Sequence, residues 1–331
     1  MSGIAAPEAS PGPRLEVSPG PHIARAGLTT RRMMLDVLIA LAPVTAVSIY
    51  LFRWHAILQI AIGVLGCSLF ELLFARMRGR PSPLGDLSAA VTGLILALSL
   101  PWSAPWYVGL VGSLVAVGIG KVVFGGLGQN IFNPAMVGRA FVMVCFPAAL
   151  GAAAYQMAGD GAAIVTQATP LTAAKQLGQS APLWPLLVGT VNGSLGETSA
   201  LGCLLGGIYL CLRRTAAWRI PLGIIAAAAL LGGIQNLAAP AAGWTVLHHL
   251  AGGALLFGAF FIATDPVTSP LTPRGMWIYG IGIGAMVMFL RAYSGYPEGV
   301  VAAVLLLNGA TPLIDRFTIP RPVGGPVPAR R

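Results

Sequence analysis

Residues 121–141 read KVVFGGLGQNIFNPAMVGRAF and contain the boundary that decides how this chain folds. Gly125, Gly126 and Gly128 interrupt an apolar run, and glycine adopts backbone conformations that other residues resist. Irregular backbone at membrane depth is tolerated only where protein or a water-filled cavity surrounds it. An apolar helix follows, with Pro134 in its first turn, where proline is well tolerated. The stretch therefore predicts an interrupted helix whose amino end faces an enclosed polar site.

The composition of the chain is that of an integral membrane protein. Of its 331 residues 56% are hydrophobic and only 9% are charged, which is too few charges to cover a soluble globule of this size. The net charge of +10 would suggest a nucleic-acid partner for a soluble domain. Here the Lys and Arg residues cluster between apolar runs, where they orient membrane spans instead. We therefore expect the lipid bilayer as the surroundings and no nucleic acid as a partner.

Ten apolar runs are long enough to cross a membrane as helices, which takes about 17 to 22 residues each. The sequence thus predicts an all-α polytopic membrane protein with about ten transmembrane helices. The runs lie near 33–52, 56–75, 84–100, 105–121, 134–150, 196–212, 218–236, 246–264, 275–291 and 297–314.

The distribution of positive charge orients these spans. If the N-terminus is cytoplasmic, the inner segments hold 16 of the 20 Lys and Arg residues, as the positive-inside rule requires. This predicts two cytoplasmic termini and places the polar stretch 159–182, after the fifth span, on the outer face. Arg31-Arg32 also resembles a twin-arginine export signal. Nine further spans favour the alternative, in which this pair anchors the start of the first span.

An internal repeat emerges when the chain is shifted by 165 residues. Six small residues or prolines then coincide, although a chain so rich in Gly and Ala could produce them by chance. Because each half has five spans, the second copy would be inverted, with interrupted helices meeting near the midplane. The predicted units are a cytoplasmic tail 1–32, a five-helix repeat 33–150, an outer loop 151–195, a second repeat 196–315 and a cytoplasmic tail 316–331.

Several polar residues within or beside the spans need an explanation. Arg139 lies inside the fifth span, where a charge costs about 2.5–3.5 kcal/mol, so it either pairs with an acid or ligand or snorkels to the surface. Asp265, Asp315 and Glu71 could bind a passing cation or proton. Alternatively, Asp265 caps a turn before a proline, and the other two acids are solvated helix ends.

The remaining polar residues have ordinary interpretations. Glu197 and Thr198 begin the sixth span and fit N-terminal capping, or polar contacts to a ligand held by the preceding loop. His248 and His249 are adjacent and are interpreted as interfacial residues that open the eighth span. The four cysteines are scattered through apolar runs without C-x-x-C spacing, so no disulfide framework, iron–sulfur site or metal site is expected.

Eight runs, spread from the first half of the chain to its last span, resemble one known family. They are Phe124-Gly-Gly-Leu-Gly-Gln-Asn130, Phe132-Asn-Pro-Ala135, Gly138-Arg-Ala-Phe141, Gly193-Ser-Leu-Gly-Glu-Thr-Ser199, Thr264-Asp-Pro-Val267, Trp277-Ile-Tyr-Gly280, Tyr296-Pro-Glu-Gly299 and Pro312-Leu-Ile-Asp315. The family includes the RnfD subunit of the Rnf ferredoxin:NAD oxidoreductase complex and the NqrB subunit of the sodium-pumping NADH:quinone reductase. The short N-terminus and the glycine run look more like RnfD.

The resemblance implies a flavin mononucleotide (FMN) joined through its phosphate to a threonine hydroxyl. Within the family pattern D-x-x-[S/T]-x-A-T, Thr166, Ala168 and Thr169 match the second half, which makes Thr169 the acceptor. Ala163 stands where the pattern has its acid, and the nearest acid is Asp160. The family's flavin transferase works on the outer side of the membrane, the side on which the charge distribution places Thr169.

The resemblance also assigns roles to the other candidates. It implies a subunit of the bacterial inner membrane that relays electrons and helps couple them to Na⁺ or H⁺ movement, with iron–sulfur and flavin-bearing subunits as partners. The residues expected near flavin are Gly125, Gly126, Gly128, Arg139, Glu197 and Thr198, and those expected in ion coupling are Asp265, Asp315 and Glu71. A second, non-covalent flavin stays open. The alternative function is a flavin-free channel or transporter for a small polar solute on the same inverted repeats.

Overall fold

The predicted all-α fold is confirmed wherever the structure, a computed structural model, describes the chain. Within that part every regular element is a helix, and the only β contact is an isolated bridge between Pro101 and Ser194. The described residues are 29–150, 170–171, 182–191, 193–238, 245–294 and 298–319.

The first half begins with one long helix, α1 (Thr30–Met77), which covers the first two predicted spans. It bends at Arg53, whose φ of 47° is unusual for a residue with a side chain, and this bend replaces the predicted gap between the spans. The elements that follow are η1 (Pro83–Asp86), α2 (Ser88–Ser99), α3 (Trp106–Val117), the π-helical turn η2 (Gly118–Val122), α4 (Pro134–Cys145) and α5 (Pro147–Leu150).

The second half contains α7 (Leu183–Val188), α8 (Ala200–Leu212), α9 (Arg219–Ala238), α10 (Val246–Ala251), α11 (Leu255–Phe257), the π-helical turn η4 (Gly258–Ile262), α12 (Pro273–Tyr293) and α13 (Val300–Thr318). The eighth predicted span, 246–264, is thus not one helix. It breaks after α10 because Gly252 is extended and Gly253 has a φ of 71°. The sequence predicted a break only at the Asp265 end of this span.

Four of the described helices, α1, α9, α12 and α13, are long and apolar enough to cross a membrane. Three of the remaining predicted spans are shorter than expected, because α2, α4 and α8 have 12 or 13 residues each. Helices of that length rise about 18–20 Å, less than the roughly 30 Å of a hydrocarbon core. Irregular backbone precedes α4, as the glycine run predicted.

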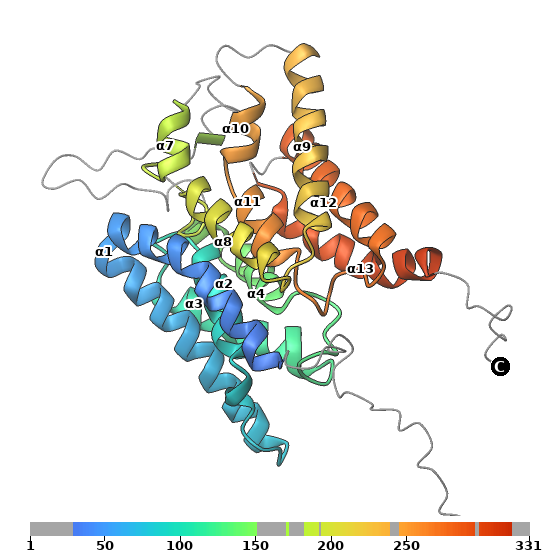
Figure 1. Ribbon diagram of the computed structural model, residues 1–331. Helices are drawn as coiled ribbons and strands as arrows, with labels where there is room; N and C mark the ends of the chain where they lie inside the picture. Colours follow the sequence, from blue (N-terminus) through green and yellow to red (C-terminus); the bar gives the residue numbers. More distant parts are fainter. Residues whose placement is uncertain are drawn as a thin grey trace, which may run out of the picture.

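The short helices lie between two outer groups of long helices (Figure 1). On one side α1 packs on α2, α3 and α8, and on the other α9, α12 and α13 pack on one another. Gly63 and Gly93 let α1 and α2 approach so closely that a Cβ on either residue would collide with the other's backbone. Shifting the bounds of α2, α3 and α4 by 165 residues lands on α11–η4, α12 and α13. The inverted orientation of the two copies stays a prediction.

Two ends of the bundle matter for function. We call the end at which α1 begins the proximal end and the end at which α1 bends at Arg53 the distal end. The turn between α8 and α9 and the loop after η4 lie at the proximal end, whereas α7 and α10 pack together at the distal end (Figure 1). The predicted cytoplasmic side corresponds to the proximal end.

Candidate functional site

A small cavity with several polar side chains in a mostly apolar lining lies at the proximal end, where the two halves of the chain meet. Its walls come from the first turns of α1 and α2, the loop between η2 and α4, the turn after α8 and the loop after η4. Its volume of about 70 Å³ holds a few water molecules or a small ion. The polar lining includes Ser88, Lys121, Asn130, Asn133, Thr264 and Asp265.

Lys121 extends from the π-helical turn η2 and is 3% exposed. Its ammonium contacts the carboxylate of Glu71 on α1 and the hydroxyl of Ser88 at the start of α2. Ser88 in turn donates to the Asp86 carboxylate at 2.6 Å. Glu71 is 4% exposed. Its interpretation as a solvated helix end is therefore wrong, because the bundle buries it against a lysine.

Asp265 lies in the loop after η4 and also lines the cavity. One of its carboxylate oxygens accepts the Val267 N–H at 3.2 Å and the other accepts the Thr268 hydroxyl at 3.3 Å. The carboxylate thus caps a turn and also lines the cavity. The two interpretations left open by the sequence, a turn cap and an acid that could bind a cation or proton, are therefore compatible. Within the described residues Asp265 forms no ion pair.

The glycine run forms the loop that closes one wall of the cavity. Gly125, Gly126 and Gly128 have φ values of 122°, 115° and 91°, which confirms that this segment needs glycine's conformational freedom. The Arg80 guanidinium donates to the Gly125 carbonyl at 3.2 Å. Leu127 lines the cavity, whereas the three glycines do not. Their predicted contact with a flavin stays a prediction.

Two asparagines end this loop and face the cavity. Asn133 is the N-cap of α4, accepting the Met136 N–H at 3.3 Å, and its amide donates to the Ile262 carbonyl of η4 at 3.4 Å. Asn130 donates its amide to the Phe132 carbonyl at 3.2 Å. Its Oδ1 is buried without a hydrogen-bond partner among the described residues. The cavity therefore holds an unused oxygen acceptor.

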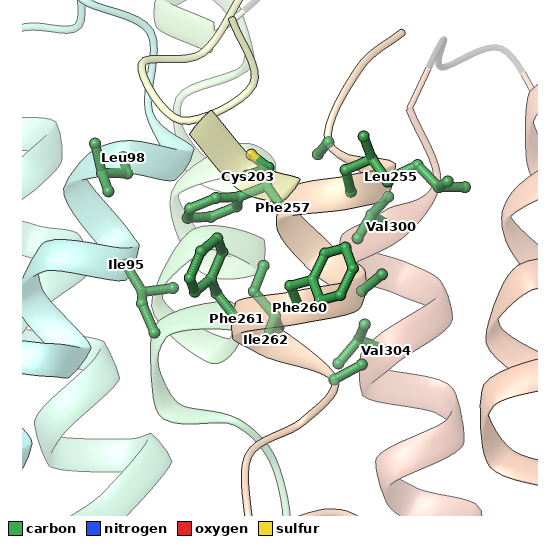
Figure 2. Packing of buried hydrophobic residues seen from close by; sticks show 14 of the residues in the cluster. Ile95, Leu98, Cys203, Leu255, Phe257, Phe260, Phe261, Ile262, Val300 and Val304 are labelled. Carbon is green, nitrogen blue, oxygen red and sulfur yellow. The ribbon is translucent and has the colours of Figure 1, made fainter. Parts of the chain in front are cut away.

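An apolar layer separates the cavity from the distal end (Figure 2). Phe261 lines the cavity, and its ring lies 5.5 Å from that of Phe257, one turn closer to the distal end. Phe257 reaches the distal loop, because a Cβ on Gly196 would lie 3.0 Å from its ring. Ile95 of α2 and Val300 of α13 lie on opposite sides of these rings (Figure 2).

A second group of charged residues lies beyond this layer, and we call Arg139, Glu197, Arg291 and Glu298 the distal cluster. The Glu197 carboxyl group is within hydrogen-bonding reach of Glu298 and interacts electrostatically with Arg139. No pair among these four described residues comes within the 4 Å of an ion pair. Arg139 and Arg291 are each 7% exposed, and Nη1 of the first and Nε of the second have no hydrogen-bond partner in the described part of the chain.

Arg291 fixes the break between α10 and α11. Its guanidinium donates to the His249 carbonyl at 2.6 Å and to the Gly252 carbonyl at 2.8 Å. Leu171, within the predicted outer loop 151–195, is buried beside the same break, since a Cβ on Gly252 would lie 3.2 Å from its methyl group. Leu171 therefore lies beside the break whose carbonyls Arg291 binds.

The structure corrects two interpretations at the distal side. Arg139 does not snorkel, because it is buried in α4. Glu197 and Thr198 do not cap the sixth helix, because Ser199 is its N-cap and accepts the Gly202 N–H at 3.1 Å. Thr198 instead donates its hydroxyl to the Leu195 carbonyl at 3.3 Å.

Three further predictions have separate outcomes. Asp315 accepts the Leu271 N–H at 3.0 Å and does not line the cavity, so the structure does not bring it together with the other acids. His248 and His249 begin the eighth span and are buried in α10, and their position at the membrane interface stays a prediction. The predicted flavin attachment at Thr166, Ala168 and Thr169 lies outside the described residues.

Sequence reasoning missed three charged residues of these sites. Lys121 and Arg291 counted only as charges that orient the chain, and Glu298 stood only within a family motif. A usable signal existed for Lys121, because it directly follows an apolar run and lies four residues before Gly125, the first glycine of the run. For Arg291 and Glu298, only the packing of α10, α12 and α13 reveals the shared position.

Comparison with known proteins gives a consistent family assignment. The chain is 43% identical over 317 residues to the D-type subunit of the Na⁺-translocating ferredoxin:NAD⁺ oxidoreductase complex of Acetobacterium woodii, covering 94% of this chain and 95% of the relative. It is 39% identical over 318 residues to the D-type subunit of the proton-translocating ferredoxin:NAD⁺ oxidoreductase complex of Clostridium ljungdahlii, covering 92% and 94%. It is 41% identical over 342 residues to the D-type subunit of the ion-translocating oxidoreductase complex of Halorhodospira halophila, covering 93% and 95%. Residues 16–324 match the model of the NQR2, RnfD, RnfE family, and the chain belongs to that family.

Proposed function

We propose that this chain is the D-type membrane subunit of an ion-translocating ferredoxin:NAD oxidoreductase complex. The observation that carries the proposal is similarity along nearly the whole chain to subunits of that type. The chain acts within the complex and not alone. Its partners are iron–sulfur and flavin-bearing subunits, and its place is the bacterial inner membrane with both termini in the cytoplasm.

Thr169 carries FMN through a phosphoester, installed by a flavin transferase on the periplasmic side. The support is the T-x-A-T match in the sequence and the position of Leu171, two residues later, beside the α10–α11 break that Arg291 binds. When bound, the flavin supplies the electron-transfer chemistry. Arg139 and Arg291 each present a buried N–H without a partner among the described residues, as suits holding an anionic group nearby. A second, non-covalent flavin stays a prediction.

The proximal cavity is the place where ion movement is coupled to electron transfer. Its carboxylate, amide and hydroxyl oxygens are the hard ligands that small cations prefer. Asp265 and Glu71 are the coupling acids, whereas Asp315 has no described contact with them. The relatives do not decide the ion, since one is named for Na⁺ and another for the proton.

Flavin attachment is tested on the denatured polypeptide. We expect the wild-type band to fluoresce under ultraviolet light after gel electrophoresis and Thr169→Val to abolish the signal. Thr172→Val, three residues later and outside the motif, serves as the matched control and keeps the fluorescence. A dark wild-type band from cells that contain the transferase would contradict the proposal and favour the flavin-free transporter.

Ion coupling is tested separately with Asp265→Asn. This substitution keeps the size of the side chain but removes its negative charge. Cation-dependent electron transfer should therefore fall while the complex stays assembled. The measurement is electron-transfer rate against salt concentration in the purified complex, with assembly followed by size-exclusion chromatography. Unchanged coupling would remove Asp265 from the ion path.

A further inference from the structure

The charges around the proximal cavity do not cancel. Glu71 is paired with Lys121, and within the described residues no basic group lies within 4 Å of Asp265. The nearby carboxylate of Asp36 has its own partner, since Arg213 lies 3.4 Å away. With these groups ionised, the cavity carries one net negative charge, that of Asp265.

One more carboxylate borders this network. Asp86 accepts both the N–H and the hydroxyl of Ser88, at 2.8 and 2.6 Å, and is half-buried at the start of α2. Ser88 stands between this carboxylate and the ammonium of Lys121. Asp86 and Glu71 both lie outside the cavity lining, but Asp86 is half-buried, where solvent screens its charge, whereas Glu71 is buried against Lys121. The charge balance of the buried groups therefore counts Glu71 and not Asp86.

Unused oxygen atoms face this charge imbalance. Asn130 is 95% buried and lines the cavity, and its Oδ1 has no hydrogen-bond partner among the described residues. Oε2 of the buried Glu71, which lies behind Lys121 and outside the lining, also has no hydrogen-bond partner in the described part of the chain. Leaving buried acceptors unpaired costs free energy unless a donor or a cation completes them. Both atoms are oxygens, as a hard cation requires.

Lys121 is held in place by its backbone as well as by its partners. It lies in a five-residue π-helical turn, a distortion that is frequent at functional sites. Its carbonyl accepts the Gly126 N–H at 3.0 Å. The ammonium and the glycine loop are therefore fixed relative to each other on two sides of one cavity.

We propose that the positively charged side chain of Lys121 sets the charge of the proximal cavity. It neutralises Glu71 and leaves the single negative charge of Asp265. The cavity therefore takes one monovalent cation at a time and disfavours a divalent one. The inference rests on the proposed ion coupling and specifies the charge of that same site. It predicts opposite effects for the two members of one ion pair. Lys121→Gln makes the cavity doubly negative, Glu71→Gln frees Lys121 to neutralise Asp265, and the double variant restores one net negative charge.

The experiment measures thermal stability of the purified complex against NaCl, with choline chloride keeping the ionic strength constant. A charge within about 4–6 Å changes the affinity of a site for a cation by at least about tenfold. We therefore expect the half-saturating Na⁺ concentration to fall at least about tenfold in Lys121→Gln and to rise at least about tenfold in Glu71→Gln. The double variant should stay within about threefold of wild type, a margin well below that effect. Ca²⁺ should compete with Na⁺ only in Lys121→Gln.

The outcomes separate this inference from the proposed function. A wild-type complex with no Na⁺-specific stabilisation overturns the cation site itself. A Na⁺-dependent wild type with unchanged affinity in Lys121→Gln and Glu71→Gln overturns only the role of Lys121. If Lys121→Gln does not assemble, Glu71→Gln and the double variant still decide, because weaker binding in the first and recovery in the second support the inference. Equal binding in both would contradict it.

Discussion

The proximal cavity and the distal cluster both place basic side chains near glutamates, but they differ in whether these side chains form an ion pair. In the cavity a lysine contacts a carboxylate, and the pair is completed by Ser88. In the distal cluster two arginines lie near two glutamates without forming an ion pair among the described residues. Arg291 instead donates hydrogen bonds to two backbone carbonyls. In the first arrangement the charge of the lysine is paired within the polypeptide, and what stays open is oxygen acceptors. The second leaves donors that a group brought to the site would satisfy.

The largest effect on stability is expected from Lys121→Gln, which leaves Glu71 buried without its partner. Removing one member of a buried pair typically costs about 3–5 kcal/mol. The measurement is thermal unfolding of the purified complex followed by circular dichroism. Lys121→Gln/Glu71→Gln is the control and should recover most of the loss, because it leaves no unpaired charge. If Lys121→Gln alone is as stable as the wild type, the ion pair between Lys121 and Glu71 does not form as described.

At the distal end, Arg291→Gln should cost about 3 kcal/mol. The guanidinium makes two hydrogen bonds to carbonyls of the α10–α11 break, and bonds from charged donors contribute about 1.5–3 kcal/mol each. Arg291→Lys keeps the charge but cannot reach both carbonyls in the same fork geometry, so it should recover only part of the loss. If the lysine variant is fully stable, charge and not geometry holds the break.

The helical regions and the glycine loop show where sequence reasoning succeeds. The apolar runs predicted the helical regions, and the glycine run predicted the irregular loop, because both are local properties of neighbouring residues. The pairing of Lys121 with Glu71 joins positions 50 residues apart. A charge count treats both as the ends of spans, whereas only the packing of η2 against α1 shows that they are buried together.

The distal cluster was even less predictable from the sequence. Glu197 fits an N-cap pattern, but the helix begins three residues later because Ser199 takes that role. Arg291 and Glu298 come from the flanks of the α12–α13 connection and meet the α10–α11 break only through the tertiary fold. Arg139 was identified as needing an explanation because a charge inside a span is rare, and that local argument was sufficient.

A smaller effect is expected in the glycine loop, where two neighbours form a matched pair. A Cβ on Gly125 would collide with the Gln129 side chain, whereas no described part of the protein lies within 4 Å of a Cβ on Gly126. Both residues have φ above 110°, so both alanine variants bear backbone strain of about 1–2 kcal/mol. Gly125→Ala should therefore lose more stability than Gly126→Ala in the same unfolding measurement. Equal losses would mean that Gln129 moves aside.

The smallest effect on stability is expected from Arg139→Gln, less than about 1 kcal/mol, although this arginine is as buried as Arg291. Its Nη1 has no partner among the described residues, so the substitution removes a group whose hydrogen bonding is incomplete. Gel fluorescence of the flavin should persist, since attachment needs the Thr169 hydroxyl. A loss as large as that of Arg291→Gln would show that Arg139 holds the polypeptide together, and the contrast between a paired proximal lysine and an unpaired distal arginine would then fail.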